Sequence, residues 1–120
     1  MEGFTKLEEA ALRDVCLRFP DDKTALTAQL TTAKVRSREN TGVGFYTRID
    51  VEHESSVALK GERMRSGGWI HIDGLDNPMG FILWLKDGYA DCLEGFTVGD
   101  STVGIELATI SFALPFLDPK

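Results

Sequence analysis

Residues 80–94 read GFILWLKDGYADCLE, in which an Asp-Gly pair separates two apolar runs. An Asp-Gly pair in this setting is a strong signal for a two-residue β-hairpin turn. A type I′ turn needs positive φ at both central positions, which Asp tolerates and Gly adopts without steric cost. We therefore expect the chain to reverse direction at Asp87 and Gly88.

The faces of this hairpin follow from counting outward from the turn, which pairs Lys86 with Tyr89 and continues in a regular register. Side chains alternate sides along a strand, so the register assigns each residue to one face. The face expected in the core carries Phe81, Leu83, Leu85, Ala90 and Cys92, with Glu94 at its margin. The opposite face carries Ile82, Trp84, Lys86, Tyr89, Asp91 and Leu93. A slip of one residue would exchange the two faces.

The N-terminal part of the chain predicts two helices. Thr5 and Glu8 fit a capping box, in which each side chain accepts a hydrogen bond from the other residue's backbone amide. A helix is therefore expected to begin there and to end before Pro20, which restricts the residue before it. Asp21 or Asp22 is expected to cap a second, Thr-rich helix.

From Lys34 onward the hydrophobic period changes from 3.6 to 2, which indicates strands. The expected elements are an edge hairpin at 35–39 and 44–51, a long mobile loop at 52–68, a strand at 69–75, and a final strand at 105–114. Residues 1–120 are thus predicted to form a single α+β domain. In this domain, two N-terminal helices pack on one face of an antiparallel meander of five to six strands.

The charge of the chain is unevenly distributed. The net charge is −6, and all of the excess lies in residues 67–120, which contain 2 basic and 8 acidic residues. This balance argues against nucleic acid as a partner, because phosphate binding needs a surplus of Lys and Arg. The surplus of acidic residues is explained either by a need for solubility alone or by a basic protein partner.

Composition and cysteine content place the chain among ordinary globular proteins. No apolar run approaches the ~18 residues of a membrane span. The N-terminus lacks the basic start and apolar stretch of a signal peptide, so we expect a cytoplasmic protein without a membrane partner. Cys16 and Cys92 are too few for a disulfide framework and are expected to be buried free thiols. No motif indicates a cofactor or a metal site.

The sheet face opposite the helices is the main candidate for function, because large exposed apolar patches usually mark interfaces. We expect homodimerisation through this face or through an edge strand. The residues expected at the contact are Ile82, Trp84, Tyr89, Asp91 and Leu93. The alternative is that the C-terminal tail, with Phe116 and Leu117, folds back over the patch.

No catalytic motif is present, so a non-enzymatic interaction or accessory module is the first expectation. The alternative is a small-molecule binding protein or small enzyme that uses a pocket between helices and sheet. Its candidate residues are His71 and Asp73, because a carboxylate beside an imidazole can begin an acid–base pair. Glu94 joins them, because a partly desolvated carboxylate has a raised pKa. The simpler interpretation of Glu94 is an edge-of-core side chain paired with an arginine.

The segment from Gly80 to Phe96 also resembles a family of small uncharacterised bacterial proteins. The shared features are the Asp-Gly-Tyr hairpin turn, the downstream Leu-Glu pair and a helical N-terminal segment. The resemblance is strong only over this segment. It implies a fold and a bacterial source, and it carries no activity and no catalytic residues.

Overall fold

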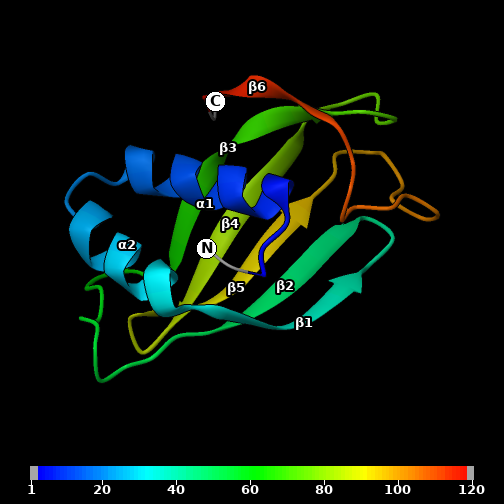
Figure 1. Ribbon diagram of the computed structural model, residues 1–120. Helices are drawn as coiled ribbons and strands as arrows, with labels where there is room; N and C mark the ends of the chain where they lie inside the picture. Colours follow the sequence, from blue (N-terminus) through cyan, green and yellow to red (C-terminus); the bar gives the residue numbers. More distant parts are fainter. Residues whose placement is uncertain (1–2, 119–120) are drawn as a thin grey trace.

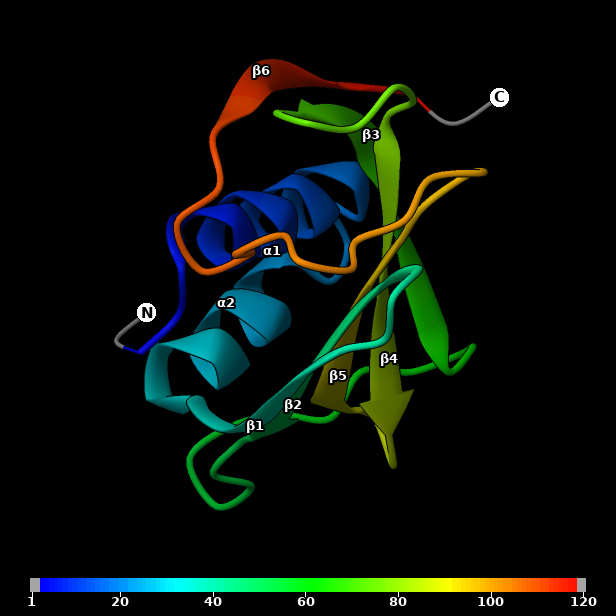
Figure 2. The same cartoon turned by 90° about the vertical axis from the view of Figure 1, so that its right-hand side faces the viewer.

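The computed structural model describes residues 3–118 and contains two helices followed by six strands. The predicted α+β class is confirmed, with both helices at the N-terminus. The helices cover one face of the sheet and leave the other face open (Figure 1 and Figure 2). The elements are α1 (Lys6–Arg18), α2 (Lys23–Thr32), β1 (Lys34–Asn40), β2 (Gly44–Asp50), β3 (Met64–Ile72), β4 (Met79–Lys86), β5 (Tyr89–Phe96) and β6 (Phe112–Leu117).

The sheet is antiparallel throughout, with the strand order β1-β2-β5-β4-β3-β6. A meander in chain order would place β3 beside β2, whereas β5 takes that position. The hairpins β3–β4 and β4–β5 stay intact, and β6 returns to the outer edge of β3. Residues 97–111 carry the chain from β5 to β6 on the helix side of the sheet, alongside α1 (Figure 2).

Both helices begin where the sequence predicted, but only α1 is capped by the predicted side-chain hydrogen bonds. The Thr5 hydroxyl accepts a hydrogen bond from the Glu8 amide at 3.1 Å, and the Glu8 carboxylate accepts one from the Thr5 amide at 2.8 Å. The predicted capping box is therefore confirmed. Asp22 stands at the N-cap of α2, but its side chain makes no capping bond. Its carboxylate instead accepts from Arg65 Nε at 2.8 Å, because a buried guanidinium needs a charged partner.

The turn between β4 and β5 has the predicted geometry, with φ of 53° at Asp87 and 86° at Gly88. A fully buried glutamine on α2 holds it in place. Gln29 Nε2 donates to the carbonyl oxygens of Gly88, at 3.0 Å, and Val57, at 2.8 Å. Its Oε1 accepts from the Ala90 amide at 2.9 Å. All the polar atoms of this side chain are thus paired, and α2 is tied to the hairpin.

The predicted register of the hairpin is correct only next to the turn. Leu85 pairs with Ala90 as expected, but Trp84 pairs with Cys92. Asp91 is the extra residue of a β-bulge, a place where two residues on one strand oppose a single residue on the other. A one-residue shift moves every later side chain to the opposite face. The predicted faces of the residues beyond Asp91 are therefore wrong.

Three residues of β5 change face as a result. Leu93, predicted at the contact surface, lies opposite Leu83 and is 0% exposed in the core. Glu94, predicted at the margin of the core, lies opposite Ile82 on the open face. Cys92 also moves to the open side of the sheet. The bulge places the larger apolar side chain in the core and returns the carboxylate to the side without helices, which hydrophobic burial favours.

The segment between β2 and β3 is shorter and better anchored than predicted. Residues 64–68, expected in a mobile loop, form the start of β3. The remaining connection is held by backbone bonds, with the Leu59 amide donating to the Gly88 carbonyl at 2.7 Å and the Leu85 amide donating to the Arg63 carbonyl at 2.7 Å. Leu59 itself is buried.

The last strand begins at Phe112 rather than at residue 105. The β-branched residues before it form no strand, because residues 105–110 cross the helix side of the molecule and have no neighbouring strand to pair with. Leu107 and Ile110 pack against the core from this irregular segment.

As far as Asp118, the C-terminal tail does not fold back over the open sheet face. The Phe116 ring meets the Phe81 ring edge-on, with centroids 5.8 Å apart, and Phe81 lies in the core. Leu117 pairs with Trp69 at the edge of the sheet. Within residues 3–118, no element therefore shelters the open face. No helix in this part of the chain is long and apolar enough to cross a membrane.

Candidate functional site

The open sheet face carries a band of large apolar side chains. They come from four adjacent strands, and each is half-buried. They are Tyr46 on β2, Phe96 on β5, Ile82 and Trp84 on β4, and Met64 and Trp69 on β3. An apolar surface of this kind, rimmed by polar groups, is typical of a protein–protein contact.

Two contacts order this band. The Trp84 indole Nε1 donates a hydrogen bond to Glu94 Oε1 at 2.9 Å. The rings of Trp69 and Phe96 meet edge-on with centroids 5.2 Å apart. The Phe96 ring lies over Gly80, where any side chain would collide with it. The aromatic groups are therefore held in fixed positions, which lowers the entropy lost when a partner binds.

The open face carries charges of both signs. The Arg48 guanidinium lies 5.5 Å from the centre of the Tyr46 ring, within the range of a cation–π contact. Glu94 on the neighbouring strand is aligned with Tyr46. A cation and a carboxylate thus lie on adjacent strands within the same apolar band.

Two other residues predicted at the contact, Tyr89 and Asp91, lie near the turn and face groups of the same chain. The Tyr89 ring is stacked on His53, with centroids 3.7 Å apart. Asp91 is the bulge residue, and its carboxylate lies 3.9 Å from the Arg36 guanidinium. With Leu93 in the core, Ile82 and Trp84 are the predicted contact residues that lie in the band.

The alternative trio of His71, Asp73 and Glu94 is not brought together. His71 lies between two buried isoleucines on β3, so its side chain projects to the open face. With Asp73 it lines a shallow hollow beside β6, and Glu94 does not reach this hollow. The predicted helix–sheet pocket with these three residues therefore does not form. Among residues 3–118, no group of three or more His, Cys, Asp or Glu side chains is placed to hold a metal ion.

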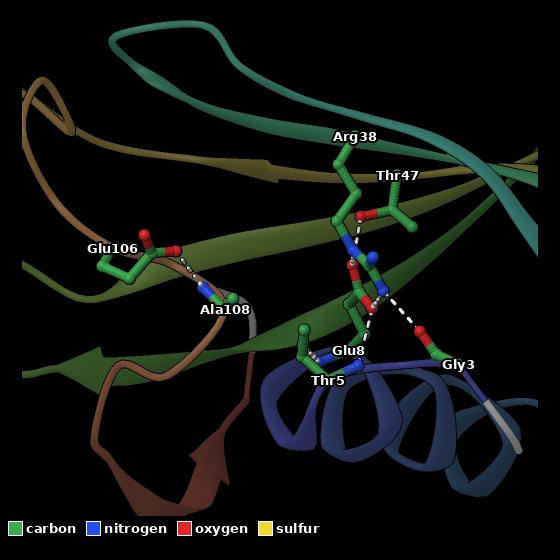
Figure 3. Close-up of polar contacts among 7 residues, drawn as sticks. All are labelled: Gly3, Thr5, Glu8, Arg38, Thr47, Glu106 and Ala108. Atoms are coloured by element: carbon green, nitrogen blue, oxygen red, sulfur yellow. Dashed lines mark hydrogen bonds and ion pairs between the residues drawn. The ribbon is translucent and has the colours of Figure 1, made fainter.

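A polar cluster on the helix side was not predicted from the sequence. Glu8 on α1 is 3% exposed, yet its carboxylate accepts four hydrogen bonds (Figure 3). Arg38 on β1 donates from Nε and Nη2, each at 2.9 Å, and Thr47 on β2 donates from its hydroxyl at 2.5 Å. The fourth donor is the Thr5 amide of the capping box. The cluster joins the start of α1 to the edge of the sheet.

The hydrogen bonds of this cluster keep Glu8 ionised. Burial alone would raise the pKa of a carboxyl group, because the charged form loses its hydration. The hydrogen bonds from Arg38, Thr47 and the Thr5 amide outweigh that effect and lower the pKa of Glu8 below its ordinary value. The same pairing raises the pKa of Arg38. Buried Glu8 and the more exposed Arg38 are therefore both charged at neutral pH.

Only half of this cluster leaves a signal in the sequence. The capping box shows Glu8 as a residue at a helix start. Arg38 follows 30 residues later in a polar edge strand, and no local pattern connects the two. Their meeting depends on how α1 packs across the sheet.

Beside the cluster lies a cavity of about 270 Å³ that is open to solvent. Its walls come from the start of α1, the hairpin β1–β2 and residues 105–108 of the segment between β5 and β6. Glu8, Arg38 and Thr47 form part of the lining, together with apolar side chains from all three walls.

In comparisons with protein-family models, curated proteins and solved structures, no match to this chain was found. The resemblance of the hairpin to the bacterial family therefore stays a prediction, and function has to be inferred from the chain itself.

Proposed function

We propose that this protein is a non-enzymatic interaction module that associates with a second copy of itself through the open sheet face. The observation that carries the proposal is the band of six half-buried apolar side chains on a face that no element within residues 3–118 covers. Soluble monomers rarely leave such a band exposed, because its burial is favourable at roughly 25 cal/mol per Å².

The charges on the face favour a second copy as the partner. In a two-fold symmetric dimer, each contact occurs twice. If one residue of the first copy meets a different residue of the second copy, the same two residues also meet with the copies exchanged. Such an arrangement can place Arg48 of each copy against Glu94 of the other. The face then pairs unlike charges around an apolar centre, as stable interfaces do.

A basic protein is the alternative partner, favoured by the surplus of acidic residues in 67–120. It needs positive charge opposite Glu94 and leaves Arg48 facing a cation, which is unfavourable. For that reason we propose a second copy of this chain, rather than a basic protein, as the partner.

The proposal predicts that the wild-type protein sediments as a dimer and that Trp84→Asp shifts it to monomer. The introduced carboxylate would be buried in the contact beside Glu94, where an unpaired charge is costly. Tyr46→Asp is a second variant, because Arg48 lies beside it and can pair with the new charge in the monomer. Analytical ultracentrifugation across a range of concentrations measures the masses, and circular dichroism checks that both variants fold.

Val103→Asp is the matched control, since Val103 is an apolar residue 77% exposed on the loop between β5 and β6, outside the band. We expect it to stay dimeric. A wild-type protein that is monomeric at all concentrations would contradict self-association. So would a folded Trp84→Asp and a folded Tyr46→Asp that both remain dimeric.

A further inference from the structure

The two helices form a groove that is separate from the open sheet face and from the cavity beside Glu8. α1 and α2 lie on the same side of the sheet (Figure 1), and the groove between them has a volume of about 390 Å³. This volume falls within the usual range for small-ligand pockets. Because the helices cover the face opposite the apolar band, a ligand in the groove would not compete with the proposed self-association.

Much of the groove surface is apolar. Cys16 of α1 and Leu30 of α2 are buried residues of its lining and form its floor. Leu17 lines the α1 side and is 68% exposed, which is unusual for a leucine beside a buried surface. Thr27 and Thr31 line the α2 side. A hydrocarbon chain lying in the groove would cover this surface, which the hydrophobic effect favours.

The charged residues that line the groove are both basic. They are Arg13 and Lys23, and within residues 3–118 no Asp or Glu belongs to the lining. The Arg13 guanidinium already has a partner, since it lies 3.7 Å from the Glu9 carboxylate. In the described part of the chain, no carboxylate lies within ion-pair distance of Lys23. The Lys23 ammonium group is therefore available to an anionic ligand.

The charge of Lys23 acts on the floor of the groove. Burial raises the pKa of the Cys16 thiol, and the positive charge of Lys23 opposes that rise. A cation has this effect only on a group near it, because the interaction weakens with distance and is screened by water. The cation and the apolar floor are therefore close enough for one small molecule to contact both.

From these observations we propose that the groove between α1 and α2 binds a monocarboxylic acid with an apolar chain, such as a fatty acid of medium length. Lys23 binds the carboxylate, and the hydrocarbon chain lies against Leu17 and Leu30. One available ammonium group matches the single charge of a carboxylate, whereas a phosphate monoester carries nearly two charges. This inference goes beyond the proposed self-association and does not depend on it.

Three probes test whether the charge and the chain are both recognised. Isothermal titration calorimetry is expected to show binding of octanoate, with butanoate bound about tenfold or more weakly because it buries fewer methylene groups. Octylammonium has the same chain and the opposite charge, and it should also bind about tenfold or more weakly, although the net charge of the protein is −6. Octylammonium or butanoate binding as tightly as octanoate would overturn the proposal. So would the absence of heat with octanoate at about 5 mM at two temperatures.

Two variants with matched controls test the location. Lys23→Gln removes the charge at the groove, so octanoate is expected to bind about tenfold more weakly, whereas Lys34→Gln, an exposed lysine at the start of β1, should leave binding unchanged. Thr27→Phe fills the groove from its exposed side and should abolish binding. Thr24→Phe, at an exposed position of α2 outside the lining, should not. Unchanged octanoate binding in both Lys23→Gln and Thr27→Phe would contradict this location. The dimer mass is expected to be the same in all four variants.

Discussion

Gly88→Val is expected to lower the free energy of unfolding by roughly 3 kcal/mol or more, the largest effect of a single substitution proposed for this chain. Gly88 has φ of 86°, which a β-branched residue adopts only with strain. A Cβ atom there would lie 2.5 Å from the Leu59 carbonyl oxygen and 2.8 Å from the Ala58 Cβ. Urea denaturation followed by circular dichroism measures the loss.

Gly99→Val separates the two causes of this loss. Gly99 has a similar φ of 79°, but nothing lies within 4 Å of a Cβ placed on it. It should therefore lose only the conformational part, about 1–2 kcal/mol. If Gly88→Val costs no more than Gly99→Val, crowding against Leu59 does not contribute. An unchanged stability of Gly88→Val would contradict the turn itself.

Glu8→Ala is expected to lower the free energy of unfolding by roughly 3 kcal/mol. The change removes the capping-box bond from the Thr5 amide to the Glu8 carboxylate and leaves the buried Thr47 hydroxyl without its acceptor. It also removes the carboxylate partner of Arg38, whose side chain is 43% exposed, so water recovers part of that loss. Thermal or urea unfolding at neutral pH measures the effect.

The same residue is expected to contribute to acid sensitivity. The pKa of Glu8 is lower in the folded protein than its ordinary value of 4.5, so the unfolded chain binds the proton more tightly. The stabilisation is complete above about pH 4.5 and is lost as the pH falls through the folded pKa. Glu8→Gln should therefore be less stable at neutral pH, with a smaller further loss between about pH 5 and pH 3.

Glu9→Gln is the matched control for this pH dependence. Glu9 is the next residue on α1 and makes a more exposed ion pair with Arg13 at 3.7 Å. Its variant should keep the acid sensitivity of the wild-type protein. A Glu8→Gln variant whose stability falls with pH as steeply as that of the wild type would show that the buried cluster does not account for it.

Much of the fold could be predicted because its signals are local. The Asp87-Gly88 turn and the Thr5–Glu8 capping box each depend on residues at most three positions apart, and both are confirmed. The change of hydrophobic period after α2 likewise placed the hairpin of β1 and β2. The final strand could not be placed this way, because β-branched residues favour a strand only where a neighbouring strand accepts their backbone bonds.

The candidate sites were harder to predict, because each depends on residues far apart in the chain. Trp84 and Ile82 were assigned to the open face correctly, since both lie on the strand before the bulge. Glu94 and Leu93 were assigned to the wrong faces, since an Asp at position 91 carries no pattern that marks a bulge. The Glu8–Arg38 cluster and the cavity beside it were missed because Glu8 and Arg38 are 30 residues apart and no local pattern connects them.

The amino-acid sequence alone determined where the chain turns and where its first helix begins, because steric limits on φ and unpaired amide groups act within a few residues. Only the tertiary structure decided which side of the sheet receives each side chain of β5, and which arginine meets the buried carboxylate of α1. Those choices minimise the burial of unpaired charge and maximise apolar contact over the whole domain, and no short segment contains that information.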